Sequence, residues 1–319
     1  MYRILVIGAV NTTKHTLNQL YKFGFDIVGV LGHEPMKKDL VSGWVDLKQL
    51  ASELNLPYKG FKKINDLENI EWAKAKQPDI IFAVGFSQLM SDYWLNMPTL
   101  GCIGFHPTYL PKGRGRAPLA WITLEQTMGS ATFFLMGKGA DDGPIFVQEI
   151  FQVLESDDAT SVEVKIEKAI IKSLDNWLPS LIKGIWEPIP QIEAEASWYG
   201  KRSIEDGLIN WQNSAIYIDR LIKASSKPHP GAYTYFKDEK VIIWKSEVEN
   251  NISIKGVVGR VLLMDDSRGL LVQCGDGLIW LKLFDLLPNL KINVGDKLGY
   301  NIEDEIYNIK LKLKALLNE

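Results

Sequence analysis

The opening of the chain alternates between short apolar runs and one amphipathic stretch, and this restricts the fold more than any other feature. The run RILVIG ends in glycine and is followed by AVNTTKHTLNQLYKFG, in which Leu17, Leu20 and Tyr21 recur at helical spacing. A second apolar run, DIVGVLG, follows at once. This order predicts a βαβ unit with parallel strands and a right-handed crossover.

The same alternation continues down the chain. WVDLKQLASELN has the pattern of a helix, PDIIFAVGF and GCIGFHP have that of buried strands, and SATFFLMGKG and GPIFVQEIFQV are further strands. SVEVKIEKAIIKSLDNWLPSLIKG then has the period of a long amphipathic helix. The predicted fold class is therefore α/β, with an open, mostly parallel, Rossmann-like sheet and helices on both of its faces over residues 1–185.

The composition changes near residue 185. Residues 186–204 contain scattered proline, glutamate and aromatic residues without a period, which is typical of a linker. After a helix-like stretch, residues 205–319 contain short strand-like runs such as AYTYFK, KVIIWKS and LIWLKLF, separated by glycine or charged turns. We therefore expect a smaller β-rich C-terminal domain, barrel-like and similar to an OB fold.

Charge and cysteine content exclude several classes of function. The formal net charge of -3 gives no general attraction to nucleic acid or to an anionic membrane, and no run approaches the roughly 18 apolar residues of a membrane span. Cys102 and Cys274 are the two cysteines, too few for a four-cysteine zinc site. We expect a cytoplasmic protein that binds no metal, no nucleic acid and no membrane.

The turn after the first strand is a candidate phosphate site. GAVNTT has one glycine where a dinucleotide fingerprint needs three, so NAD binding is not expected. Backbone N–H groups of Thr12 and Thr13, with the charge of Lys14, could hold a substrate phosphate at the start of the helix. Alternatively, one of the two threonines caps the helix.

The stretch GFHPTYLPKGRGRAPLAW places His106 at a strand end, where ligands bind in open α/β sheets. Histidine suits proton transfer near neutral pH, and GKGADDGPIF supplies Asp141 and Asp142 in a turn that could orient it. The residues alone leave two interpretations open, a base with its orienting carboxylate or a packed loop histidine near a common turn.

These motifs resemble a known family. HPTYLPKGRGRAP is similar to the His-Pro-Ser-Leu-Leu-Pro-x-x-Arg-Gly-x-x-Pro segment of the folate-dependent formyltransferases, and GADDGPI resembles their Asp-x-Gly turn. RSIEDGLINW and PHPGAYTYF resemble their linker and second-domain segments, so the resemblance covers nearly the whole chain. It implies an enzyme that transfers a formyl group from 10-formyltetrahydrofolate to an amine without a metal.

The resemblance also assigns residues. His106 matches the family base, and Asp141 matches the family aspartate because it stands two residues before Gly143. GFSQLM matches the segment whose backbone binds the pterin ring. The residues implied for folate are Phe86, Ser87, Gln88, Leu89, Met90 and Asp141. Those expected to bind the acceptor substrate are Thr12, Thr13, Lys14, Thr108, Arg114, Gly115 and Arg116, of which Arg114 and Gly115 match the family's Arg-Gly pair. The two loop glycines, Gly113 and Gly115, are expected to let the backbone approach a ligand.

Gly104 departs from the family pattern, which has asparagine two residues before the histidine. Loss of one such oxyanion donor costs about 100- to 1000-fold in rate. Another donor such as Gln88, a backbone N–H or a water could replace it, the enzyme could be slow, or the chain could bind folate or a nucleotide sugar without catalysis. We expect Gly104→Asn to preserve or raise activity if the site keeps the family geometry, and to lower it if Gly104 makes room for something else.

The acceptor amine is the remaining question. GHEPMKKDLVSGWVDLKQLASELNLPY has two consecutive lysines and no arginine-rich insertion, whereas tRNA binding needs basic surface. VSGWVDLKQLASELNLPY resembles the sugar N-formyltransferases. The expected partner is a nucleotide-linked amino sugar of polysaccharide biosynthesis, with methionyl-tRNA as the alternative. Strand edges in the C-terminal domain leave a homodimer open.

Overall fold

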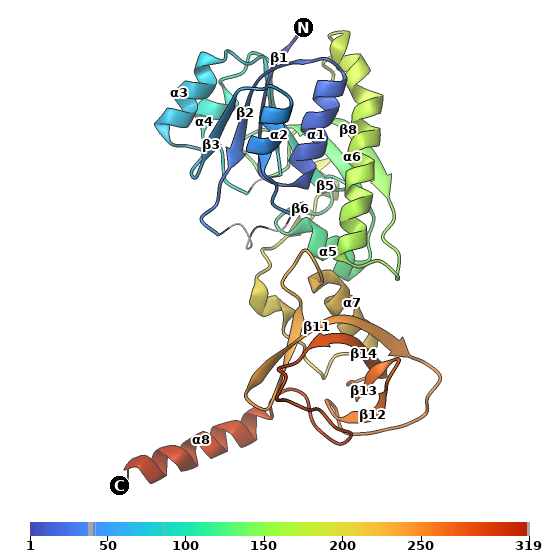
Figure 1. Ribbon diagram of the computed structural model, residues 1–319. Helices are drawn as coiled ribbons and strands as arrows, with labels where there is room; N and C mark the ends of the chain where they lie inside the picture. Colours follow the sequence, from blue (N-terminus) through green and yellow to red (C-terminus); the bar gives the residue numbers. More distant parts are fainter. Residues whose placement is uncertain (38–40, 42, 86, 318–319) are drawn as a thin grey trace. The chain divides into compact units, whose positions relative to one another are not determined.

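The computed structural model describes residues 1–37, 41, 43–85 and 87–317. The chain divides into two compact units, Met1–Arg202 and Ser203–Glu319, which are described separately below (Figure 1). The segment 186–204, expected to be a linker, therefore lies almost entirely within the first unit.

The first unit is built on a seven-stranded sheet with the order β3-β2-β1-β4-β5-β7-β8. Strands β1 to β5 pair in parallel, and β7 and β8 run antiparallel to their neighbours, which confirms the mostly parallel sheet. The strands are β1 (Arg3–Gly8), β2 (Asp26–His33), β3 (Tyr58–Phe61), β4 (Ile80–Val84), β5 (Gly101–Thr108), β7 (Gly129–Leu135) and β8 (Ile145–Phe151).

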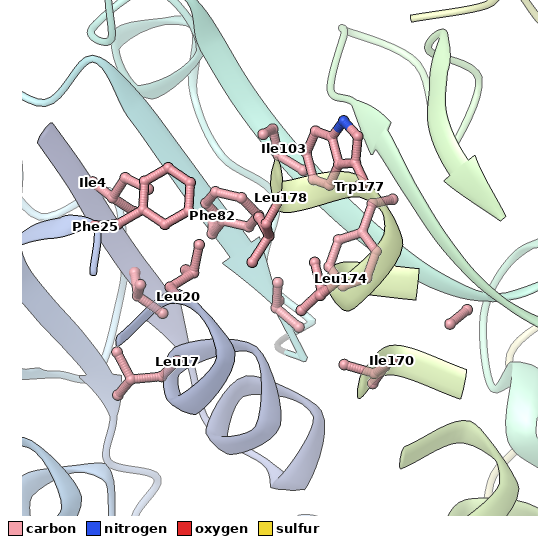
Figure 2. Close-up of a cluster of buried hydrophobic side chains, with 14 of the residues drawn as sticks. Ile4, Leu17, Leu20, Phe25, Phe82, Ile103, Ile170, Leu174, Trp177 and Leu178 are labelled. Atoms are coloured by element: carbon pink, nitrogen blue, oxygen red, sulfur yellow. The ribbon is translucent and has the colours of Figure 1, made fainter. Parts of the chain in front are cut away.

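Helices cover both faces of this sheet. Successive side chains of a strand point to opposite faces, so an entirely apolar strand needs cover on both sides. Ile4 and Val6 belong to one core cluster, and Leu5 and Ile7 belong to the other. The first cluster packs against α1 (Asn11–Lys22), α2 (Leu47–Glu53), α5 (Pro118–Glu125) and α6 (Ala159–Ile182), and the second against α3 (Leu67–Ala75) and α4 (Asp92–Leu95). Figure 2 shows the first cluster, with side chains of α1 and α6 meeting Phe82 of β4.

A second, two-stranded sheet attaches the end of the first unit to the loop after β5. β6 (Arg114–Gly115) pairs in parallel with β9 (Trp198–Tyr199), which follows the 3-10 helix η2 (Glu193–Glu195). The end of the first unit is thus bonded directly to the loop that contains Gly113, Arg114, Gly115 and Arg116.

The second unit confirms the β-rich C-terminal domain. Its five-stranded antiparallel sheet has the order β10-β11-β14-β13-β12. The strands are β10 (Ala232–Phe236), β11 (Glu239–Glu249), β12 (Val261–Asp265), β13 (Gly269–Gln273) and β14 (Leu278–Asp285). They follow η3 (Ile204–Gly207) and α7 (Ala215–Ser225), and α7 packs against β11.

The last element is a helix that the sequence analysis did not predict. Residues Ile302–Leu317 form a helix, α8, drawn in red in Figure 1. The alternation IKLKLK resembles a strand pattern, but the longer-range apolar spacing of three and four residues fits a helix.

Candidate active site

His106 lies near the carboxyl end of β5 and is buried. Its Nε2 donates to the carbonyl oxygen of Gly113 at 2.8 Å, since a carbonyl can only accept. Nδ1 lies 3.5 Å from Oδ2 of Asp141. Burial lowers the pKa of His106, while the charge of Asp141 and the bond to Gly113 partly oppose this lowering. The arrangement is that of a neutral base whose charged form would face a carboxylate.

Asp141 is held in place from two sides. The backbone N–H of Gly115 donates to its Oδ2 at 2.9 Å, and Nε2 of Gln191 donates to its carbonyl oxygen at 2.8 Å and to that of Gly143 at 2.7 Å. Asp141 has a φ of +55°, a left-handed conformation that few residues other than glycine and asparagine or aspartate adopt. The turn is therefore fixed in a conformation that places this carboxylate, rather than that of Asp142, against His106.

The loop glycines lie against β9. Gly113 and Gly115 have φ values of +72° and +104°. A Cβ at Gly113 would lie 2.7 Å from Cε2 of Tyr199, and one at Gly115 would lie 2.6 Å from the Tyr199 carbonyl oxygen. The glycines thus make room for β9. Thr108 is buried, and its hydroxyl donates at 3.3 Å to the same Gly113 carbonyl that His106 uses.

Arg114 is buried and bonded within the protein. Its Nε and Nη2 donate to Oε1 of Gln191 at 3.2 and 3.0 Å, and its Nη1 lies 2.9 Å from Oε2 of Glu193. Its guanidinium also lies 5.4 Å from the ring centre of Trp198. These partners occupy the fork that was expected to bind substrate. Arg116 is exposed and keeps its charge available.

Side chains from β7 and the residue after it close off the space beside Gly104. A Cβ at Gly104 would lie 2.7 Å from Cζ of Phe134 and 2.9 Å from Cγ of Met136. Phe134 is buried, so its ring cannot move outward without disturbing the core. An asparagine side chain therefore cannot be accommodated here without displacing both neighbours.

Both ends of the Gln88 side-chain amide hydrogen-bond to the loop after β3. Its Nε2 donates to the Lys62 carbonyl at 2.7 Å, and its Oε1 accepts from the N–H of Ile64 at 2.8 Å. Asn65 ties the same segment by donating to the Leu89 carbonyl at 2.9 Å. Ser87 and Leu89 are exposed, Met90 is partly buried, and Phe86 lies outside the described residues. The segment after β4 is thus anchored to the loop after β3.

The three residues expected to bind phosphate at the start of α1, Thr12, Thr13 and Lys14, have different surroundings. Thr13 is buried; its hydroxyl donates to the Val84 carbonyl at 2.6 Å and accepts from the N–H of Ala9 at 3.0 Å, so it joins β1, α1 and β4. The hydroxyl of Thr12 is buried and has no partner among the described residues. It lies beside Gly85, where a Cβ would come within 2.4 Å of it. Lys14 is exposed.

Two residues of this arrangement have no signal in the sequence. Gln191 links the Asp141 turn to Arg114, and Gln148 donates to the Leu110 carbonyl at 2.9 Å beneath the loop. Neither belongs to a recognisable motif.

Among the described residues, no group of three or more histidines, cysteines or acidic residues could hold a metal ion. No described helix has both the length and the apolar character of a membrane span.

Comparison with known proteins identifies the family of the chain and solved structures with a similar fold. Residues 2–176 match the family model described as formyl transferase, and residues 201–291 match formyl transferase, C-terminal domain. The N-formyltransferase from Helicobacter canadensis, solved with folinic acid and dTDP-3-aminofucose, has a TM-score of 0.68 at 18% identity and covers 88% of this chain and 99% of its own.

Two further structures share the fold. HypX from Aquifex aeolicus, in complex with tetrahydrofolic acid, has a TM-score of 0.60 at 19% identity and covers 88% of this chain. This chain spans 43% of HypX. Methionyl-tRNA formyltransferase from Clostridium thermocellum has a TM-score of 0.54 at 17% identity and covers 79% of this chain and 96% of its own.

Proposed function

The chain belongs to the formyl transferase family, and we propose that it transfers a formyl group from 10-formyltetrahydrofolate to the amine of a nucleotide-linked amino sugar. The observation that carries the proposal is the pairing of buried His106, near the carboxyl end of β5, with the partly buried carboxylate of Asp141. In an open α/β sheet this edge is where ligands bind.

The residues around β4 fit a folate co-substrate. The hydroxyl of Thr12, which has no partner among the described residues, lies at the start of α1 beside Gly85, the first residue of the segment that the family resemblance assigns to the pterin ring. Gln88 and Asn65 hold this segment in place. We propose that residues 85–90 bind the pterin and that Thr12 hydrogen-bonds a polar atom of a bound ligand.

The proposed chemistry uses the two nitrogens of His106 differently. Bound 10-formyltetrahydrofolate would supply the formyl carbon that the acceptor amine attacks. Nδ1 of neutral His106 would accept the proton that the amine loses as its nitrogen bonds to the formyl carbon, and Asp141 would stabilise the resulting imidazolium. The bond between the formyl carbon and N10 of the folate would then break, and His106 would return the proton to N10 so that tetrahydrofolate leaves. Gly113 keeps the hydrogen on Nε2 and so maintains this tautomer. Because Gly104 carries no side chain, no side-chain donor from that position would reach the negative charge that develops on the formyl oxygen.

The choice of a sugar acceptor is supported by charge and by the relatives. The chain has a formal charge of -3, and the exposed cations near the site are single ones such as Arg116 and Lys14, which suit a diphosphate better than a tRNA. The Helicobacter canadensis structure contains dTDP-3-aminofucose, a nucleotide-linked amino sugar.

A formylation assay tests the proposal. Purified protein is incubated with 10-formyltetrahydrofolate and a panel of nucleotide-linked 3-amino- and 4-amino-sugars, and the sugars are analysed by mass spectrometry for one added formyl group. His106→Ala should abolish the product. His15→Ala is the matched control. His15 lies on α1, where its Nε2 is 3.5 Å from Oε2 of Glu167, and it is not paired with Asp141.

Each outcome distinguishes the alternatives. Formylation of methionyl-tRNA and of no sugar would contradict the proposed acceptor. Binding of folate or sugar without turnover for every acceptor would instead support a protein that binds without catalysing.

A further inference from the structure

Helix α8 has one apolar stripe that nothing in its own unit covers. None of its described residues is buried. Five apolar residues recur at alternating spacings of four and three: Ile302, Ile306, Ile309, Leu313 and Leu316, which are between 48% and 70% exposed. This spacing keeps them on one face and is that of the central seam of a two-helix coiled coil. Tyr307 and Leu311 lie outside the stripe.

The charges beside this stripe are divided along the helix. Glu303 and Glu305 flank its first part, and Lys310 and Lys312 flank its second part. In the heptad numbering that the stripe defines, Glu303 and Lys310 occupy one flanking position, and Glu305 and Lys312 occupy the other. A helix of this kind is complementary to a reversed copy of itself.

We infer that α8 pairs in antiparallel orientation with α8 of a second copy of this chain. In this register Ile306 lies opposite Ile309 of the partner subunit, and Ile302 lies opposite Leu313 of the partner subunit. Glu303 meets Lys310 of the partner subunit, and Glu305 meets Lys312 of the partner subunit, so symmetry makes four opposite-charge pairs. Opposed helix dipoles also favour this orientation.

A parallel pair satisfies the charges less well. It would set Glu305 opposite Lys310 of the partner subunit, which gives two pairs by symmetry, and it would bring the two acidic first turns together. Binding to an anionic membrane surface would use the lysines but repel the same acidic turn. The inference does not depend on the proposed enzymatic activity.

Sedimentation equilibrium of the full chain tests the pairing. The average mass should rise from one chain towards two as concentration increases, because a short seam buries a modest area. Leu313→Glu should leave the protein monomeric throughout. Leu311→Glu is the matched control, since Leu311 and Leu313 are 47% and 51% exposed on the same helix, and it should dimerise like the unaltered chain. Circular dichroism confirms that both variants are folded.

Charge exchange and cross-linking test the partner and its direction. The variants E303K/E305K and K310E/K312E should each be monomeric alone and should form a mixed dimer when combined. Ile302→Cys and Leu313→Cys chains should form a disulfide with each other and not with themselves. The native Cys102 and Cys274 are buried and do not interfere.

Three results would overturn the inference. The first is a chain that stays monomeric at every concentration. The second is a dimer that survives Leu313→Glu or is lost equally in Leu311→Glu. The third is Ile302→Cys cross-linking to itself, which would require parallel helices.

Discussion

At the scale of single residues, the proposed reaction depends on what surrounds the two nitrogens of His106. Gly113 fixes the hydrogen on Nε2, and Asp141 faces Nδ1 at 3.5 Å, where the accepted proton would reside. Burial lowers the pKa of the ring, so the neutral form is present at neutral pH. One carboxylate therefore controls how readily the base becomes charged.

The pH dependence of Asp141→Asn tests this coupling. A base must be unprotonated, so the rate should rise with pH through the pKa of His106, which burial keeps below its ordinary value. Removing the Asp141 charge lowers that pKa further, so the acidic limb of the pH–rate profile should move to lower pH. The plateau should fall by about 100-fold or more. Asp142→Asn is the control and should leave the limb in place; an unmoved limb in Asp141→Asn would contradict the coupling.

The structure also changes the expectation for Gly104→Asn. Phe134 and Met136 occupy the volume that the new side chain needs, so the substitution should destabilise the protein by about 1–3 kcal/mol and reduce activity. Thermal unfolding measures the loss. Gly200→Asn is the control, because no atom lies within 4 Å of a Cβ built there. Equal melting temperatures for Gly104→Asn and the unaltered protein would show that the neighbours yield easily.

At the scale of elements, the strand β9 and the residues before it form part of the site's support. Gln191 donates to the carbonyls of Asp141 and Gly143 and accepts from Arg114, so one side chain connects the aspartate turn with the arginine loop. The segment that resembles a linker by composition therefore positions the carboxylate.

Gln191→Ala should lower kcat by about 10- to 100-fold, because a small displacement of Asp141 weakens its alignment with His106. KM should change less, since Gln191 acts through the aspartate turn and is assigned no contact with substrate. Steady-state kinetics measure both. Gln49→Ala removes an exposed glutamine that bonds to Glu53 on α2, and it should have no effect. Equal losses in the two variants would contradict a positioning role for Gln191.

The sequence predicts the strands and the pairing of His106 with Asp141 better than it predicts other contacts between distant residues. Periodicity places the strands that contain Phe82 and His106, and the resemblance selects Asp141 over Asp142. The contacts of Gly113 and Gly115 could not be predicted, because they are made with the ring and the backbone of Tyr199, which lies far along the chain. Helix α8 was missed because its lysines alternate with apolar residues as in a strand.

At the scale of the whole molecule, the second unit has its own buried charge network. Glu249 at the end of β11 is buried and accepts from Nε1 of Trp280 at 2.8 Å, from the N–H of Asn251 at 2.6 Å and from Nη1 of Arg268 at 2.6 Å. These bonds lower the pKa of Glu249 to about 2. The carboxylate stabilises the folded unit above its ordinary pKa of 4.5, and this contribution is lost as pH falls towards 2.

Glu249→Gln should therefore destabilise the protein at neutral pH and make its stability less dependent on pH between about 4.5 and 2. Urea unfolding followed by tryptophan fluorescence at pH 7 and pH 3 measures both effects. Glu239→Gln, at the exposed start of the same strand, should behave like the unaltered protein. If the stability of Glu249→Gln depended on pH as strongly as that of the unaltered protein, groups other than Glu249 would be responsible for the loss of stability in acid.

The central claim is that the chain formylates a nucleotide-linked amino sugar with His106 as the base. The most direct measurement is formylation of the sugar panel by the unaltered protein and by His106→Ala at equal concentration. The account predicts a formylated sugar with the unaltered protein and none above background with the variant. A formylated sugar produced equally well by His106→Ala would contradict it.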